Sequence, residues 1–301
     1  MTLQREILPD TTRFLTRVCV GREHLLQATK IVNHTFEYLL AVGAKRFDIG
    51  VVAYVAMSDH YHLVVHDFAG RMPAFTEWFN AQLARSLNCV RGRWGSMWEG
   101  EQPNQPEIAD GEKVLDKMAY TLANPTLSGL VAESATWVGA RSGVGAMGRE
   151  RVIPRPRGVA YFDRGSLPEE AVLQLIVPPL LAHLGPEEVS QRLREAVAKM
   201  EAEKQRDMAA QGRRFMGARR VGALSWRRRA TTPLPRGRWR VVKPLVLASS
   251  IRDRELVLRR IRHFRAAYAV ARSALLRGER QVFPPGTYWL RVHLGVPTQP
   301  S

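Results

Sequence analysis

Two apolar runs separated by a short polar turn constrain the fold of this chain most strongly. Residues 49–57 and 60–65 are rich in Val, Ala, Tyr and Leu, and Ser58 and Asp59 stand between them. Runs of this length bounded by turn-forming residues are typical of strands, so the sequence predicts an antiparallel hairpin. Any fold for this chain has to place that hairpin within a sheet.

The elements on either side of this hairpin predict an α+β fold. The apolar spacing predicts a strand at 13–20, a helix at 25–42, a helix from Pro73 to Leu87 and a fourth strand at 94–98. The resulting order βαββαβ is the ferredoxin-like arrangement, which has an antiparallel sheet with helices on one face. The other face is then expected to be free for a site.

His60 and His62 flank Tyr61 within the second strand of the hairpin. Because side chains alternate along a strand, both imidazoles project from the same face, and Tyr61 projects from the other. Two neutral imidazoles suit a divalent cation but are too few for a closed structural site. The pattern indicates half of an open metal site; the alternative is a pair of partly buried, hydrogen-bonded histidines.

A tyrosine and an asparagine share one face of a later predicted helix. The helix covers 112–123 and is expected to end at Asn124-Pro125, because proline disfavours helical conformation in the preceding residue. Tyr120 and Asn124 lie one turn apart. A phenol beside a metal site can attack phosphorus and retain the phosphate as phosphotyrosine.

Two ordered motifs give the chain a family resemblance. The sequence Met57-Ser-Asp-His-Tyr-His-Leu63 is followed by Ala119-Tyr-Thr-Leu-Ala-Asn-Pro125 and then by Gly129-Leu-Val131. Over about residues 10–140, this order resembles the REP-associated tyrosine transposases. These are single-tyrosine members of the HUH endonuclease group, with a ferredoxin-like fold, that cut hairpin-bearing single-stranded DNA.

The resemblance implies a role for each motif residue. His60 and His62 would bind Mg²⁺ or Mn²⁺, Tyr120 would be the nucleophile, and Asn124 would be the third metal ligand. For Asn124 a plain helix C-cap remains the alternative. Family members often carry Asn before the first histidine, whereas Asp59 stands here, either as a turn residue or as an acceptor that orients an imidazole.

The excess of positive charge lies in the second half of the chain. The net charge is +17; residues 1–140 carry 13 Lys or Arg against 15 Asp or Glu, so residues 141–301 carry 32 against 13. Arginine-rich segments interleaved with aromatic residues are typical of nucleic-acid binding. The DNA-contacting arginines expected from this pattern are Arg91, Arg93, Arg227, Arg228, Arg229, Arg238 and Arg240. A solvated basic surface is the alternative.

These observations predict a division of the chain into three parts. Residues 1–140 form the catalytic domain, 141–165 a linker rich in Gly, Arg and Pro, and 166–301 a basic, mainly helical DNA-binding extension. A capping box at 166–169 predicts one helix through Leu173 and Ile176, and further helices are expected at 186–208 and 252–276.

The sequence therefore predicts a transposase-like, metal-dependent endonuclease and strand transferase that acts on single-stranded or hairpin DNA. The alternative is a catalytically inactive DNA-binding or regulatory protein of the same fold. With two cysteines and no apolar run long enough to span a membrane, a cytoplasmic monomer or homodimer is expected.

Overall fold

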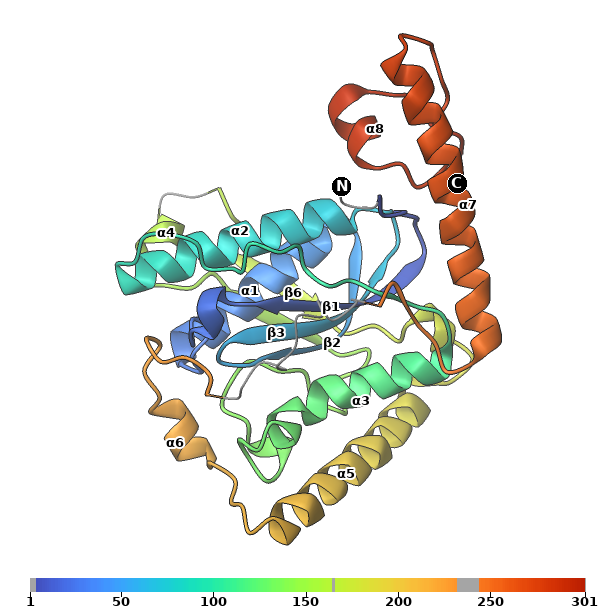
Figure 1. Cartoon of the computed structure of the whole chain (residues 1–301). Helices are drawn as coiled ribbons and strands as arrows, with labels where there is room; N and C mark the ends of the chain where they lie inside the picture. The colour runs from blue at the N-terminus through green and yellow to red at the C-terminus, as the bar shows by residue number, and fades with distance from the viewer. Residues whose placement is uncertain (1–3, 164–165, 232–243, 301) are drawn as a thin grey trace.

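The protein combines a five-stranded sheet, a separate two-stranded ribbon and helices on both sides of the sheet (Figure 1). The computed structural model describes residues 4–163, 166–231 and 244–300. The strands are β1 (Thr11–Val18), β2 (Ile49–Ala56), β3 (His60–Asp67), β4 (Glu107–Ile108), β5 (Glu150–Pro154), β6 (Glu170–Gln174) and β7 (Val246–Leu247). The α-helices are α1 (Lys30–Phe47), α2 (Met72–Arg91), α3 (Gly111–Leu127), α4 (Ala160–Asp163), α5 (Pro186–Ala210), α6 (Ala218–Gly222), α7 (Ile251–Leu276) and α8 (Trp289–Leu294), with short 3-10 turns at Val20–Arg22, Ser134–Thr136 and Pro179–Leu181.

The main sheet has the strand order β2-β3-β1-β4-β7. Its first four strands are antiparallel and follow the order β1-α1-β2-β3-α2-β4 along the chain, so the predicted ferredoxin-like α+β arrangement is confirmed. The fifth strand, β7, comes from the C-terminal half and pairs with β4 in parallel. The sheet is therefore mixed, whereas a wholly antiparallel sheet was predicted.

The prediction of a fourth strand at 94–98 is wrong. Gly92 and Gly95 both have positive φ and turn the chain after α2, and Trp98 forms only an isolated bridge with Cys19. The strand that completes the ferredoxin-like order lies later, at β4.

Both faces of the sheet carry helices. On one face Tyr61 packs against Phe36 of α1 and Phe79 of α2. On the other face α3 packs across β2 and β3, and α5 packs against α3 (Figure 1). The expectation of a free second face is therefore wrong, because α3 covers it.

Helix α3 extends beyond its predicted end. Asn124 and Pro125 lie within it, and Ser128 is the C-cap. A proline in the last turn costs only the bond that its missing N–H would have made to the carbonyl of Thr121. The C-cap interpretation of Asn124 is therefore wrong.

The segment expected to be a linker contains β5, which pairs with β6. The helix expected from the capping box at 166–169 is wrong, because Ala171, Leu173 and Leu175 are buried at alternate positions, as in a strand. Leu173, Leu175 and Ile153 join the main hydrophobic core. The division of the chain into domains remains a prediction, but the core does not end at residue 140.

The helices predicted at 186–208 and 252–276 are confirmed as α5 and α7. We define the C-terminal arm as residues 251–296, which comprise α7, α8 and their connection. The arm has a small core of its own, built from Phe264, Tyr268, Phe283 and Val296.

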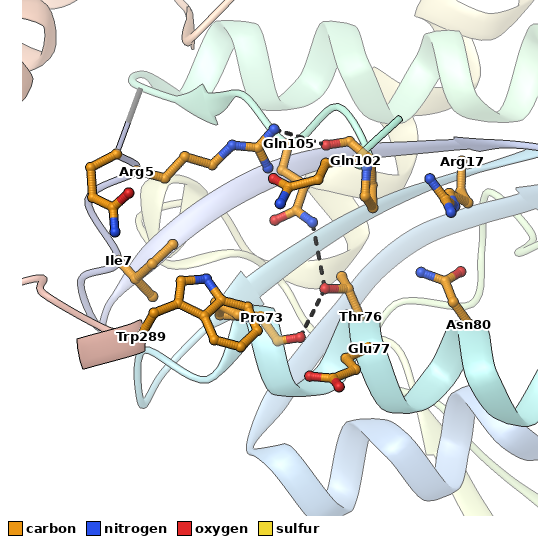
Figure 2. Close-up of a pocket in the computed structure, with 12 residues that line it drawn as sticks. Arg5, Ile7, Arg17, Pro73, Thr76, Glu77, Asn80, Gln102, Gln105 and Trp289 are labelled. Carbon is orange, nitrogen blue, oxygen red and sulfur yellow. Dashed lines mark hydrogen bonds between the residues drawn. The ribbon is translucent and has the colours of Figure 1, made fainter. Parts of the chain in front are cut away.

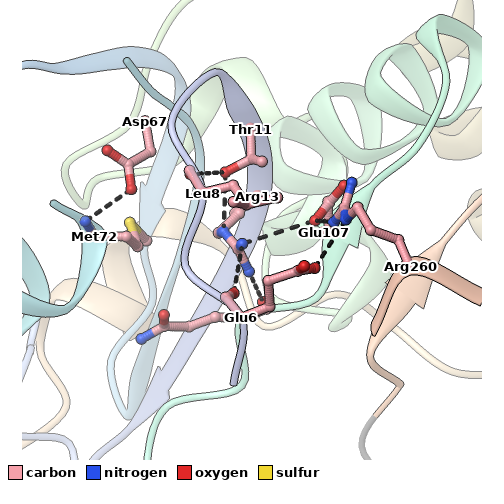
Figure 3. A network of polar contacts seen from close by, with 9 residues as sticks. Glu6, Leu8, Thr11, Arg13, Asp67, Met72, Glu107 and Arg260 are labelled. Atoms are coloured by element: carbon pink, nitrogen blue, oxygen red, sulfur yellow. Dashed lines mark hydrogen bonds and ion pairs between the residues drawn. The ribbon is translucent and has the colours of Figure 1, made fainter. Parts of the chain in front are cut away.

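A network of charged side chains, in which both carboxylates are buried, attaches this arm to the β4 side of the sheet (Figure 3). Arg260 of α7 donates to Glu6 at 2.8 Å and to Glu107 at 2.6 Å. Arg13 of β1 lies 3.7 Å from the same Glu107 carboxylate. Because both glutamates are buried, they need these guanidinium partners.

No helix of the described residues is long and apolar enough to cross a membrane.

Candidate functional site

Strand β3 presents His60 and His62 on the face of the sheet that α3 covers. His62 lies opposite Thr16 of β1, and His60 lies opposite Val18. The two imidazole centroids are 4.8 Å apart, as expected for alternate residues on one face. Phe14 stacks on His62 at 5.1 Å and fixes the plane of that ring.

Each histidine has its Nδ1 atom engaged by a neighbour. His60 Nδ1 donates to the Asp59 carboxylate at 2.7 Å, and His62 Nδ1 is hydrogen-bonded to Thr16 Oγ1 at 2.8 Å. A partner on Nδ1 orients the ring and, when Nδ1 carries the proton, leaves Nε2 as the basic nitrogen. The His60 and His62 rings are thus held in the manner of metal-ligating histidines.

Helix α3 brings Tyr120 and Asn124 to the same place. The Tyr120 ring lies 5.5 Å from that of His62 and 6.0 Å from that of Phe14. Asn124 is 3% exposed, and its Oδ1 accepts from Ser128 at 3.4 Å. The structure therefore brings His60, His62 and Tyr120 together from two separate stretches of the sequence, and it places Asn124 one helical turn beyond Tyr120.

Burial sets the electrostatics of this cluster. It raises the pKa of Tyr120, and an interaction with the side chain of Asn124 partly opposes that shift. It lowers the pKa of His62 well below the usual value, and His60 and Lys117 lower it further. His62 is thus neutral, the form that a metal ligand needs, and Tyr120 is a protonated phenol at neutral pH.

A divalent cation fits this donor set. Two imidazoles and one amide oxygen make an incomplete set that leaves positions for water or phosphate, which suits Mn²⁺ and is compatible with Mg²⁺. Among the described residues no group of three His, Cys, Asp or Glu side chains comes together as a metal site. A third protein ligand would therefore have to be of another residue type, and the Asn124 amide is the candidate that the sequence offers.

Asp59 and His66 lie on either side of the histidine pair along the sequence. Although burial alone would raise the pKa of Asp59, its bond from His60 and the nearby Arg22 lower it, so Asp59 is an ionised acceptor that orients an imidazole. His66, further along β3, is 2% exposed and is hydrogen-bonded to Thr12 at 3.0 Å.

Five of the predicted arginines gather beside the Ser58-Asp59 turn. Trp226 lies under both Arg91, at 5.7 Å, and Arg227, at 5.1 Å. Burial lowers the pKa of Arg91 to about 10, so this guanidinium is partly enclosed rather than fully open to solvent.

Glu23 joins two more of these arginines. Its carboxylate lies 3.7 Å from Arg93 and 3.2 Å from Arg229, and the backbone of Arg228 accepts from His24 N at 2.9 Å. Residues 226–230 are thus folded back onto the N-terminal half, next to Arg22 and its ion pair with Asp59. Arg238 and Arg240 lie outside the described residues.

Three residues close to the site escaped the sequence analysis. Lys117 lies 4.9 Å over the Tyr120 ring, and its position three residues before Tyr120 on one helix was a usable signal. Thr16 and Phe14 touch His62 only through the β1–β3 register, which no local pattern reveals. Trp94, which follows Arg93, is 95% exposed.

Comparison with known proteins gives partial structural likenesses. No protein-family model matches the sequence, and no curated protein matches it. A REP-associated tyrosine transposase, solved bound to a REP hairpin, is similar over 46% of this chain and 79% of its own, with 16% identity and a TM-score of 0.39. A candidate transposase from Deinococcus radiodurans R1 is similar over 34% of this chain and 82% of its own, with 19% identity and a TM-score of 0.26. What this chain does has therefore to be derived from its own residues.

Proposed function

We propose that the protein is a metal-dependent, single-stranded DNA endonuclease and strand transferase with Tyr120 as nucleophile. The observation that carries the proposal is the meeting of Tyr120 with His62 across the α3 face, at 5.5 Å between ring centroids. A phenol held against the neutral imidazole of His62, with the oriented ring of His60 beside it, supplies the groups that metal-assisted phosphoryl transfer uses.

The chemistry balances without a nucleotide cofactor. The Tyr120 oxygen attacks the phosphorus of a DNA linkage, the bond from phosphorus to the preceding O3′ breaks, and the phenolic proton passes to that O3′. The products are a 5′-phosphotyrosine and a free 3′-OH, which can attack back and rejoin the strand. A Mg²⁺ or Mn²⁺ ion held by His60, His62 and Asn124 would neutralise phosphate charge.

Residues of this chain support the same step. Lys117 lies over the Tyr120 ring and adds a fixed positive charge beside the phenol, which favours the phenolate and an approaching phosphate. Thr16 orients the imidazole of His62, and Asp59 that of His60, each through a hydrogen bond at Nδ1. The raised pKa of Tyr120 means that the attacking oxygen needs such charges nearby.

The proposed substrate is single-stranded or hairpin DNA. Arg91, Arg93 and Arg227 form a basic surface beside the turn that precedes His60, and Trp94 presents an open indole there. Arginine binds phosphate, and an open indole can stack with an unpaired base. We extend the proposal to a cytoplasmic protein that acts as a monomer or homodimer.

The test is denaturing electrophoresis after incubation of the full chain with labelled hairpin DNA and Mn²⁺. The expected result is a covalent protein–DNA band that disappears with EDTA and with Tyr120→Phe. Tyr38→Phe is the matched control, because this tyrosine is buried in α1 and bonds Pro168 away from the site.

One observation favours the second candidate, a DNA-binding protein of this fold without catalysis. Tyr120 of α3 is partly buried and packs edge-on against Phe14, and burial raises its pKa, which a tyrosine with a packing role alone would also show. Metal-independent DNA binding without any adduct, over a broad set of hairpins, is the result that would replace the first proposal by this one.

A further inference from the structure

A cavity lies away from the histidines, on the α2 side of the sheet. Its volume is about 380 Å³, within the range of small-molecule sites, and it opens between α2, the 102–105 loop and α8 (Figure 2). Arg17 lines it, and Arg17 follows Thr16, the partner of His62, in β1. Because neighbouring strand residues face opposite ways, the cavity and the histidine site stand back to back across β1.

The lining of the cavity offers positive charge held in place by neutral groups. The Arg5 guanidinium donates to the Pro103 carbonyl at 3.2 Å, and that of Arg17 donates to the Glu101 carbonyl. A carbonyl oxygen orients a guanidinium but does not cancel its charge. Burial lowers the pKa of both arginines, as expected for cations that have lost water.

An indole closes the cavity from the C-terminal arm. Trp289 of α8 stacks on His293 with ring centroids 4.9 Å apart and planes 11° apart, so its ring is held rigidly, and it lines the cavity (Figure 2). A rigid indole is a platform on which a flat heterocycle can stack. Glu77 and Gln105 supply an acceptor and an amide that can meet the edge of such a ring.

The arm reaches this position through one glycine. Gly286 has φ +84°, and its carbonyl accepts from Ile7 N at 3.0 Å. A Cβ at this position would lie 2.8 Å from Glu6 Cγ, so only glycine allows this approach. Three residues later the chain places Trp289 over the cavity.

We propose that this cavity binds one nucleotide, with the base against Trp289 and the phosphate between Arg5 and Arg17. Two cations against the single carboxylate of Glu77 favour an anionic ligand, and the indole favours one that carries an aromatic ring. Glu77 accepts hydrogen bonds, which the exocyclic amino groups of adenine, cytosine and guanine or the ring N3–H of thymine can donate. The inference does not depend on strand cleavage, because the cavity lies on the other face of the sheet from Tyr120.

The nucleotide can be free or part of a strand, and titration calorimetry of the full chain distinguishes the two. The probes are dAMP, dCMP, dGMP, dTMP, inorganic phosphate and a short single-stranded oligonucleotide. Binding of dAMP together with weak binding of phosphate identifies a free-nucleotide site. Binding of the oligonucleotide alone, if weakened by Trp289→Ala, identifies a nucleotide of a strand.

Variants separate the cavity from the general basic surface. Trp289→Ala is expected to raise the dissociation constant about tenfold, and Trp289→Phe to raise it less, because phenylalanine still stacks. Arg5→Gln is expected to weaken binding, whereas Arg252→Gln, which removes an equal but exposed charge, leaves it unchanged. Circular dichroism checks that each variant is folded.

Two results would overturn the inference. One is the absence of binding for every nucleotide and the oligonucleotide at millimolar concentration. The other is binding that Trp289→Ala and Arg5→Gln leave intact in folded protein. Neither result touches the proposed function, whose readout is the Tyr120 adduct.

Discussion

The α3 face of the sheet and its β4 side both bury polar side chains, but these side chains find different kinds of partner. On the β4 side, Glu6 and Glu107 form ion pairs with Arg260, which attach the C-terminal arm. On the α3 face, His60 and His62 each bond through Nδ1 to a neighbour. The first arrangement completes its own pairing, whereas the second orients rings for something outside the chain. We infer that the β4 side serves assembly and the α3 face serves chemistry.

The sharpest test of this contrast is Tyr120→Phe, with the largest expected effect. Loss of one hydroxyl should abolish the covalent adduct completely, because no other atom supplies the nucleophile. The thermal midpoint should change little, since the ring still packs against Phe14. The checks are a denaturing gel and a melting curve, and a persistent adduct would contradict the assignment of the face to chemistry.

Glu107→Gln is expected to lower the stability of the fold and to leave adduct formation intact. It leaves Arg13 and Arg260 without their shared carboxylate, and breaking a buried ion pair costs about 3 kcal/mol. Urea unfolding should show this loss, while adduct formation per folded molecule stays near that of the unaltered protein. Glu255→Gln, at an exposed ion pair with Arg262, is the control and should leave stability nearly unchanged.

Thr16→Val tests the orienting role on the α3 face. It keeps the shape of the side chain but removes the bond to His62 Nδ1. Loss of such a partner typically weakens metal affinity by about 10- to 100-fold. The concentration of Mn²⁺ that gives half-maximal adduct should therefore rise, while the adduct at saturating metal recovers. An unchanged metal requirement would mean that His62 is not a ligand.

Arg227→Gln should have a smaller effect on DNA binding. If this guanidinium meets a phosphate, the slope of log affinity against log salt falls by about 1, without change of preferred sequence. Filter binding at several salt concentrations measures the slope. Arg192→Gln is the matched control, because its ion pair with Glu188 lies on exposed α5. Equal slopes in both variants would mean that Arg227 does not contact a DNA phosphate.

The smallest expected effect concerns pH. Burial lowers the pKa of His66 in the folded protein, so the unfolded chain binds the extra proton first as the pH falls. The stability that neutral His66 contributes is present above its unfolded pKa of about 6.5 and declines as the pH falls below it. His66→Asn, which can keep a bond to Thr12, should flatten the decline between pH 7 and pH 5 in urea titrations. An equal decline in the variant would assign it to other groups.

The sequence predicted local features of the molecule better than its long-range pairings. The hairpin and the order of the first elements follow from local periodicity, and His60, His62, Tyr120 and Asn124 stood out by type and spacing. The partners Thr16 and Phe14 depend on the register of β1 against β3, which local patterns do not encode. The strand β7 was not predicted, because two residues that pair with β4 leave no periodic signal.

Two errors share one physical cause. The region 166–176 was predicted as a helix from its capping box, yet tertiary packing selected strand β6, whose alternate residues enter the core. Likewise α3 continued through Pro125 because packing against the sheet and α5 outweighs one lost backbone bond. Capping residues and prolines at the end of an element therefore predict its type and length less well than the burial of the side chains along it.

The attachment of α7 to Glu6, ahead of β1, and to Glu107 of β4 also orders events during synthesis. Glu6 and Arg13 leave the ribosome early, but Arg260, to which Glu6 binds, is translated near the end of the chain. Until then the β4 side of the sheet lacks both Arg260 and the parallel strand β7. A nascent chain can therefore form its hairpin and α3 long before its sheet is finished. Truncation shortly before residue 260 would leave buried Glu6 without its guanidinium and Glu107 with Arg13 alone, so a nearly full-length product should be more prone to aggregation than its length suggests.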